Sequence, residues 1–268
     1  MVLSYIQEHW INQMNIDSAA SISAWDSVAE DYVYDGSVSL EKNSFLQFMQ
    51  SKIELSANMQ VLDVGCGAGA YSLALAPKVK KAVGVDFSPK MIEAANRSSA
   101  QLGIANAVFF ERDWHNCDGA EFKGQYDVVF AHTTPAVVDY DSFMKMMDAS
   151  KKYCFFCKPA RRTDEVLDQL RFLLGMNQLK HDESIAYTFD TIWAHGFNPE
   201  LSYEKTVWKS SKSLDEAKVW YLGRLKGTGH LTSAQEEMVC RHLVSISENG
   251  RVLEITHTTL VNIFWEVK

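Results

Sequence analysis

A glycine-rich run carries the strongest chemical signal in the chain. It reads Val61-Leu62-Asp63-Val64-Gly65-Cys66-Gly67-Ala68-Gly69 and stands where a buried strand ends and a helix begins. Glycines at such a junction let the backbone turn sharply and approach a ligand without a Cβ in the way. In open α/β sheets, ligands bind beyond the carboxyl ends of the strands. The run therefore predicts a ligand-binding turn, although a tight turn without a ligand would use the same residues.

Two carboxylates follow at the ends of the next two predicted strands. Asp86 lies about twenty residues after the glycines, where an acid can accept hydrogen bonds from both hydroxyls of a ribose. Asp113 follows the strand-like sequence Phe109-Phe110-Glu111-Arg112. Because the carboxyl ends of parallel strands meet at one edge of a sheet, the two acids and the glycine turn should converge. This ordered set predicts a site for a ligand that contains a ribose.

The elements that must position these residues alternate between strands and helices. Nearly continuous apolar runs such as Val61-Leu62-Asp63-Val64 are typical of strands that are buried on both faces. Alternation at this spacing predicts a parallel sheet with right-handed crossovers. The expected strands are Gln60–Val64, Lys81–Asp86, Ala107–Arg112, Tyr126–Ala131 and Lys152–Cys157, and the expected helices between them are Tyr71–Ala76, Pro89–Leu102 and Ser142–Ser150.

The segments outside this core do not show the alternation of strands and helices. Ahead of it, one helical face is expected from Trp25, Val28, Ala29 and Tyr32, and another helix within Glu41–Leu55. Behind it, amphipathic helices are expected at Thr163–Leu174, Leu214–Lys226 and Ser233–Ser247, and antiparallel strands at Leu201–Lys209 and Arg251–Val267. The fold class is therefore α/β: a doubly wound, Rossmann-like, mostly parallel sheet of about seven strands, with an antiparallel C-terminal strand pair and extra helices.

From Trp25 to Cys157 the chain resembles the class I S-adenosylmethionine-dependent methyltransferases. The resemblance implies S-adenosylmethionine as cofactor and S-adenosylhomocysteine as product. It implies that Asp63 lies near the amino group of the methionine moiety, that Asp86 holds the ribose, and that Asp113 reaches the adenine amino group. The implied cofactor-binding residues are Trp25, Tyr34, Asp63, Gly65, Cys66, Gly67, Asp86, Phe87, Met91, Asp113, Trp114 and Ala131.

The chain is expected to form a single domain of the class I methyltransferase type over residues 1–268. Within it we expect an N-terminal helical cap at 1–56, a cofactor-binding core at 57–160 and a C-terminal half at 161–268. The C-terminal half would contain a substrate-side excursion, Gly175–Pro199, between its helices and its antiparallel strands.

The glycine turn also satisfies a dinucleotide pattern, so a nicotinamide-dependent oxidoreductase is the rival reading. A pyrophosphate rests against backbone N–H groups, and a carboxylate at Asp63 that faced the ligand would repel it. The same carboxylate would attract the positively charged amino group of S-adenosylmethionine. The sign of the charge therefore favours the methyl donor. A protein that binds this cofactor without turnover is the third alternative.

The acceptor should be bound beyond the fourth predicted strand, in Ala131-His132-Thr133-Thr134-Pro135. His132 is the candidate general base, because an imidazole titrates near working pH, although it could equally be a structural loop histidine. His195 is a second candidate, for which ordinary helix packing is the better interpretation. The Asn/Asp-Pro-Pro-aromatic sequence of enzymes that methylate exocyclic amines of bases is absent. We therefore expect a small-molecule acceptor whose accepting atom is left open.

Charge and cysteine usage complete the expectations. The formal net charge is −8, and the basic run Lys158, Arg161 and Arg162 reads as a solvated strand end, so nucleic acid is not expected as a partner. No apolar run long enough for a membrane span is present, and cytoplasmic location is expected. Cys154 and Cys157 should point to opposite faces of a strand, and no metal is expected. The oligomeric state is left open.

Overall fold

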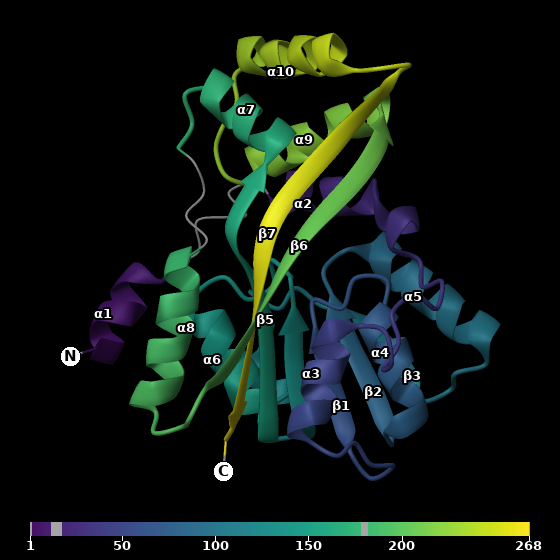
Figure 1. Ribbon diagram of the computed structural model, residues 1–268, viewed down its shortest axis with the longest axis vertical. Coiled ribbons are helices and arrows are strands. Elements are labelled where there is room, and N and C mark those ends of the chain that lie inside the picture. The colour runs from purple at the N-terminus through teal and green to yellow at the C-terminus, as the bar shows by residue number, and fades with distance from the viewer. Residues whose placement is uncertain (1, 12–17, 178–181, 268) are drawn as a thin grey trace.

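The computed structural model describes residues 2–11, 18–177 and 182–267 and contains one seven-stranded sheet (Figure 1). The strand order is β3-β2-β1-β4-β5-β7-β6, with parallel pairing through β5 and antiparallel pairing of β7 with β5 and β6. The predicted fold class is confirmed. Residues 12–17 of the predicted cap and 178–181 of the predicted excursion lie outside the described residues. The strands are β1 Gln60–Val64, β2 Lys81–Asp86, β3 Ala107–Glu111, β4 Tyr126–His132, β5 Ser150–Asp164, β6 Glu200–Ser213 and β7 Arg251–Glu266.

Helices cover both faces of the parallel part of the sheet. One face packs on α3 (Ser44–Lys52), α4 (Ala70–Leu75) and α5 (Pro89–Leu102), and the other on α1 (Val2–His9), α6 (Tyr140–Ala149) and α8 (Asp182–Ala194). The strands between them are apolar on both sides, as doubly covered strands must be. Cys154 belongs to the second of these cores and Cys157 to the first, so the two sulfurs lie on opposite faces, as predicted.

Local capping explains why the helix bounds follow the sequence closely. Helix α5 begins after Ser88, whose hydroxyl accepts the Met91 N–H, has Pro89 at its first position and ends at Gly103 with φ +66°. The structure gives α5 the predicted bounds for this reason, because Pro suits the first turn and Gly suits a left-handed C-terminal cap. Capping boxes likewise open α6, α9 (Leu214–Lys226) and α10 (Ser233–Ile246).

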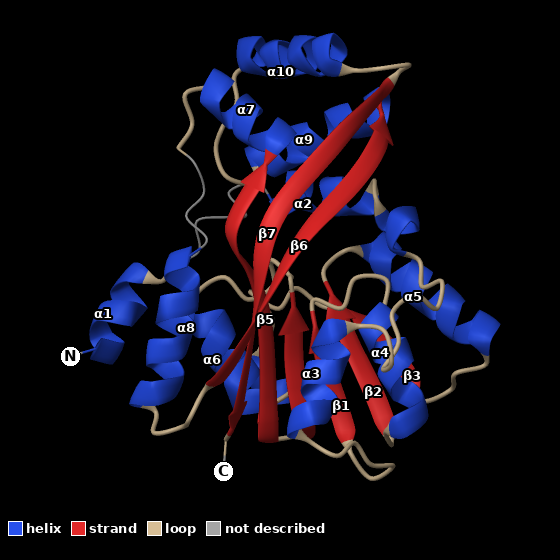
Figure 2. Cartoon of the chain, in the orientation of Figure 1, coloured by secondary structure: helices blue, strands red, loops and turns tan. Residues whose placement is uncertain are grey.

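Beyond the core, β5, β7 and β6 continue as a long three-stranded arm that carries a second layer of helices (Figure 2). Strand β5 extends to Asp164, although the sequence predicted its end at Cys157. The continuation exists because β7 pairs with it from Tyr153↔Glu266 to Asp164↔Thr256. Helices α2 (Ser18–Asp26), α7 (Glu165–Leu173), α9 and α10 pack together at this end around a separate apolar core.

The N-terminal helices lie in three different places. Helix α1 contacts α8, α2 packs on α9, and α3 lies on the sheet. The predicted helix through Trp25 and Tyr32 is interrupted: α2 ends at Asp26, and a short 3-10 helix follows at Ala29–Tyr32. The Asp26 carboxylate accepts hydrogen bonds from the Ser88 hydroxyl at 2.6 Å and from the Lys90 N–H at 3.3 Å. Through these bonds α2 is fixed to the start of α5. No helix that the structure describes is long and apolar enough to cross a membrane.

Candidate cofactor and acceptor site

The glycine turn after β1 adopts a backbone that only glycine accepts without strain. Gly65, Gly67 and Gly69 have φ values of +70°, +53° and +80°. A Cβ on Gly65 would lie 1.9 Å from the Oγ1 of Thr134, so the loop after β4 closes directly over this residue. The Gly65 and Cys66 N–H groups both donate to the Val85 carbonyl. Glycine is therefore required at position 65 by both conformation and space.

Asp86, at the end of β2, fixes the turn through a hydrogen bond to its backbone. Its Oδ2 accepts the Gly67 N–H at 2.9 Å, and its Oδ1 accepts the Ser88 N–H at 2.9 Å. Burial raises the pKa of this carboxyl to about 6, against the opposing effect of these hydrogen bonds. The second strand thus supplies one carboxylate that both shapes the turn and lines the cavity beside it.

Asp63 is a second buried carboxylate behind the turn. It is 2% exposed, and its Oδ2 accepts a hydrogen bond from the Ser72 hydroxyl at 2.9 Å. Burial, with a smaller contribution from the charge of Asp86, raises the pKa of Asp63 to about 7, although the Ser72 hydrogen bond acts in the opposite direction. Neither acid forms an ion pair with any residue that the structure describes. A cationic ligand at this turn would therefore relieve the cost of ionising both groups.

These elements surround a cavity of about 620 Å3. Its walls come from the glycine turn, the α2 region, the β5 arm and α9. A small recess of about 30 Å3 adjoins it and shares Asp86, Phe87 and Pro135 with it. Ten of the thirteen residues predicted for the site line the large cavity, namely Trp25, Tyr34, Asp63, Gly65, Cys66, Gly67, Asp86, Phe87, Met91 and His132. Asp113 and Trp114 line the recess.

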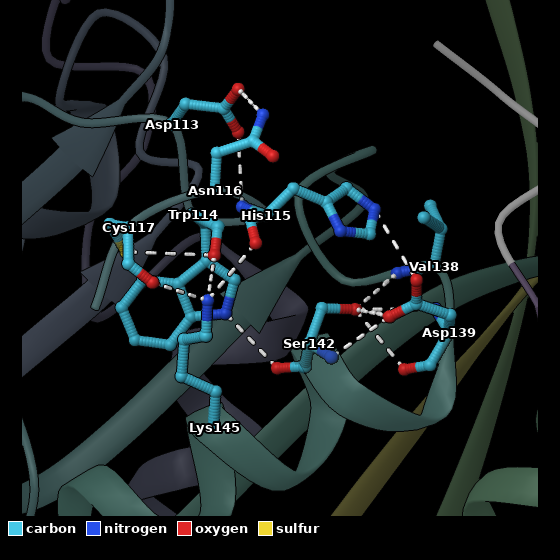
Figure 3. Close-up of polar contacts among 9 residues, drawn as sticks. All are labelled: Asp113, Trp114, His115, Asn116, Cys117, Val138, Asp139, Ser142 and Lys145. Carbon is cyan, nitrogen blue, oxygen red and sulfur yellow. Dashed lines mark hydrogen bonds and ion pairs between the residues drawn. The ribbon is translucent and has the colours of Figure 1, made fainter. Parts of the chain in front are cut away.

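The loop that carries Asp113 and Trp114 is held rigidly by polar contacts (Figure 3). The Asp113 carboxylate accepts the His115 N–H at 3.0 Å and the Asn116 side-chain amide at 2.7 Å. The Trp114 indole is buried and donates its Nε1–H to the Ser142 carbonyl at 3.0 Å. The Lys145 ammonium donates to the carbonyls of Trp114, His115 and Cys117. Trp114 therefore packs in the core of the protein and also lines the recess.

Ala131 lines neither space. It lies in β4 without exposed surface, and its register partner is Phe156 in β5. Its position inside the strand, one residue before the strand end, buries it in the core beside α6.

His132 lines the cavity, and both of its ring nitrogens have partners. The Tyr71 hydroxyl lies 3.2 Å from Nε2, and the Thr133 Oγ1 lies 3.1 Å from Nδ1. Burial lowers the pKa of His132 to about 3, so the imidazole is neutral at working pH. Its role as general base stays a prediction. His195 lies on neither cavity wall and contacts the Thr191 carbonyl of its own helix region through Nδ1.

Four cationic side chains that the sequence did not place at the site also line the cavity. They are Lys158, Arg162, Arg171 and Arg224. Lys158 and Arg162 were expected at a solvated strand end, and this expectation is wrong because β5 does not end there. The only signal in the sequence was the basic composition of the run, since the strand that pairs with it lies about a hundred residues later along the chain.

The comparison with known proteins agrees with this geometry. A family model described as a methyltransferase domain matches residues 55–210, more than half of the chain. The protein belongs to this family of methyltransferase domains. The predicted resemblance to class I methyltransferases and their cofactor, S-adenosylmethionine, is confirmed, and the match decides against the nicotinamide-dependent alternative.

Individual relatives cover parts of the chain. An uncharacterized RNA methyltransferase of Bacillus cereus is 37% identical over 90 residues, covering 30% of this chain and 20% of the relative. An uncharacterized protein of Haemophilus influenzae is 26% identical over 166 residues, covering 61% and 60%. The chain thus spans one fifth and three fifths of these two relatives. The crystal structure of the YcgJ protein of Bacillus subtilis, at 19% identity, has a TM-score of 0.50 and covers 83% of this chain and 97% of that one, which shows the fold alone.

The expectation that nucleic acid is excluded as a partner is wrong. The Bacillus cereus relative is an RNA methyltransferase by name, and so are further relatives from mouse and Haemophilus influenzae. The argument failed because net charge averages over the whole surface, whereas phosphate binding depends on where cations gather. In this chain several cations gather inside the cavity.

The pKa values of the two acids predict a pH-dependent cofactor affinity. Below pH 7 Asp63 becomes protonated in the free protein, and below pH 6 Asp86 does, so each loses its attraction for a cation. The dissociation constant for S-adenosylmethionine should therefore rise as the pH falls from 8 to 5.5. Calorimetry in two buffers of different ionisation enthalpy should show net proton release on binding near pH 6.5. Asp63→Asn should flatten this dependence, and an identical pH profile in both proteins would contradict the assignment.

Proposed function

We propose that the protein transfers a methyl group from S-adenosylmethionine to a small-molecule acceptor bound in the same cavity. The observation that carries this proposal is the pair of buried carboxylates, Asp63 and Asp86, beside a turn of left-handed glycines. Such a pair suits a ligand that is cationic at its amino acid end and has ribose hydroxyls to donate. The residues present therefore fit the cofactor.

The proposed contacts follow the walls of the two spaces. Asp86 would accept the ribose hydroxyls, and Phe87 would lie against the adenine. The adenine edge would enter the recess toward Asp113. Trp25 and Tyr34 would cover the methionine end from the N-terminal side. These positions are supported by the large cavity, which Trp25, Tyr34, Asp86 and Phe87 line together, and by the adjoining recess, which Asp113 lines.

The chemistry asked of this chain is chiefly alignment. The bound cofactor supplies an electrophilic methyl group, and its transfer needs an acceptor atom held in line with the carbon–sulfur bond. A small-molecule acceptor is supported by the size of the cavity, whose 620 Å3 lies within the range of about 300–1,000 Å3 typical of ligand pockets.

Calorimetric titration tests the cofactor half of the proposal. S-adenosylmethionine and S-adenosylhomocysteine should both bind with one site per chain, and NADH should show neither heat nor fluorescence enhancement. Lack of heat and of thermal stabilisation at millimolar S-adenosylmethionine would overturn the proposal. A screen with methyl-labelled cofactor then tests transfer. Binding without label transfer to any small molecule, but with transfer to RNA, would overturn the acceptor class.

His132 is expected to remain neutral throughout the working range. Because burial lowers its pKa to about 3, its ring carbon and proton NMR signals should not move between pH 5.5 and 8. His132→Asn identifies the signals among those of the other histidines. General-base catalysis contributes about 10²–10⁴-fold in rate, so an asparagine variant that retains more than a tenth of the wild-type rate would show alignment without a base. Titration of His132 near pH 6.5 would restore the general-base role.

A further inference from the structure

The cavity has opposite charges at its two ends. Asp63 and Asp86 lie at the glycine turn, whereas Lys158 and Arg162 enter from β5 and Arg224 enters from α9. The other two acids on the wall lie at its exposed rim: Asp35 accepts the Ser37 N–H, and Asp31 lies 3.4 Å from the Lys212 ammonium. The β5–α9 end is therefore cationic in its interior.

Arg224 has no hydrogen-bond acceptor among the residues that the structure describes. Its guanidinium lies over the Trp220 ring, 5.4 Å from the centroid. Burial lowers the pKa of Arg224, and the like charge of Arg162 lowers it further. Asp164 and Glu254 act in the opposite direction, but the Glu254 carboxylate already accepts bonds from the Tyr221 hydroxyl and the Val166 N–H. A half-buried guanidinium that lacks a hydrogen-bond acceptor and lies near another cation is costly unless a ligand pairs with it.

Arg162 and Lys158 extend the same cationic surface along β5. The Arg162 side chain is 16% exposed and uses Nε and Nη2 on the Asp164 carboxylate. Its guanidinium also lies 5.4 Å from the centroid of the Trp208 ring. The Lys158 ammonium lies 5.6 Å from the Phe156 ring centroid and, within the described part of the chain, has no hydrogen-bond acceptor. Burial lowers the pKa of Lys158 to about 8, while Asp139 opposes the shift.

Aromatic side chains complete this end of the cavity. Tyr32 is 48% exposed and lines the cavity. Arg162 and Arg224 are the cations that act on this phenol. Trp25 lies edge-on to both Tyr32 and Trp220. Flat apolar walls beside paired guanidiniums suit a planar molecule with an anionic group.

We infer that the β5–α9 end of the cavity is the acceptor site, and that the acceptor is a small anionic molecule whose carboxylate or phosphate is held by Arg162 and Arg224. The inference rests on the proposed function, because it names the acceptor class of that reaction. Arg162 is already paired with Asp164, and the single carboxylate of the cofactor would still leave either Lys158 or Arg224 without an anionic partner. Arginine forks bind carboxylates and phosphates alike, so the experiment must separate the two anions.

The test uses the full chain, with and without saturating S-adenosylhomocysteine, and three matched probes: benzoate, phenyl phosphate and the neutral benzamide. At least one anion should bind at least tenfold more tightly than benzamide by calorimetry. The tighter anion identifies carboxylate or phosphate. Arg224→Gln should weaken the anion at least tenfold, Arg224→Lys should weaken it less, and S-adenosylhomocysteine affinity should stay unchanged in both. Arg241→Gln, at an exposed pair with Glu237, is the matched control.

Each contrary result has a distinct meaning. Equal binding of anions and benzamide, or an unchanged anion affinity in Arg224→Gln, would overturn the inference. Loss of S-adenosylhomocysteine affinity in that variant would assign the cations to the cofactor carboxylate and overturn it as well. Arg224-dependent binding of a 5′-phosphorylated RNA trinucleotide, with no binding of the small anions, would replace the small acceptor by nucleic acid. Failure of the wild-type protein to bind S-adenosylhomocysteine would instead remove the proposed function and with it the acceptor role, and the anion titrations of the ligand-free chain would then decide only whether Arg162 and Arg224 form an anion site.

Discussion

Asp86→Asn should weaken S-adenosylmethionine binding about 10–100-fold while leaving the fold intact. Hydrogen bonds to a charged group contribute about 1.5–3 kcal/mol, and about 1.4 kcal/mol corresponds to tenfold in affinity. The structure gives a second reason to expect weaker binding: the two carboxylate oxygens of Asp86 accept hydrogen bonds from the backbone N–H groups of Gly67 and Ser88. An asparagine has only one acceptor oxygen and would turn its amide toward the other N–H. The turn that holds the cofactor would thereby lose an anchor as well as the ligand contact.

A matched control for this variant lies at the other ends of the strands, near the start of β4. Asp127 also sits on an inner strand, and its carboxylate also accepts a backbone N–H, from Gln60 at 2.9 Å. Asp127→Asn should cost a similar amount of stability without any change in cofactor affinity. Calorimetry and thermal melting of both variants separate the two effects. Equal cofactor affinity in the Asp86 variant and the wild type would show that β2 does not face the ligand.

Gly65→Ala should abolish measurable cofactor binding. A left-handed backbone costs a non-glycine residue about 1–2 kcal/mol. At this position the new Cβ would also lie 1.9 Å from the Thr134 Oγ1 and 2.7 Å from its Cβ, so the loop after β4 must move. Because that loop and the turn both line the cavity, the displacement should reduce affinity at least 100-fold.

Gly103→Ala provides the control for strain alone. Gly103 has nearly the same φ, +66°, but no heavy atom lies within 4 Å of its added Cβ. This variant should lower the melting temperature slightly and bind the cofactor normally. Adding Thr134→Gly to Gly65→Ala should recover part of the affinity, because it removes the two closest atoms. Wild-type affinity in Gly65→Ala alone would disprove the close approach of the two loops.

Features set by neighbouring residues could be predicted from the sequence. The cap, proline and terminal glycine of Pro89–Leu102 define that helix within a few residues, and the structure reproduces its bounds. The glycine turn and Asp86 were likewise placed correctly at one sheet edge, because strand ends and spacing determine where they lie. Ala131 shows the limit of this reasoning. Successive residues of a strand point to opposite faces, so Ala131 lies in the core whereas the next residue, His132, lines the cavity.

The acceptor end depends on long-range pairing and could not be predicted. Whether Arg162 is solvated or enclosed depends on β7, which continues β5 as an arm, and on α9, which faces it. The expectation that Leu214–Lys226 is amphipathic is wrong: polar and apolar residues lie on all sides of this helix, so its pattern does not distinguish an inward from an outward Arg224 guanidinium. The Trp114 indole was expected beside adenine, but its main polar contact, to the Ser142 carbonyl, forms only when α6 packs against the loop.

The position of β7 in the sheet has a consequence for how the chain acquires its final form. Strand β7 follows β6 along the chain but lies between β5 and β6 in the sheet, so β6 pairs along its full length only with a strand made after it. During synthesis, the 14 residues of β6 therefore remain unpaired until β7 has been made, while the earlier parallel strands can already assemble. The nascent chain should form its glycine-turn edge first and its basic end only after β7 has been made.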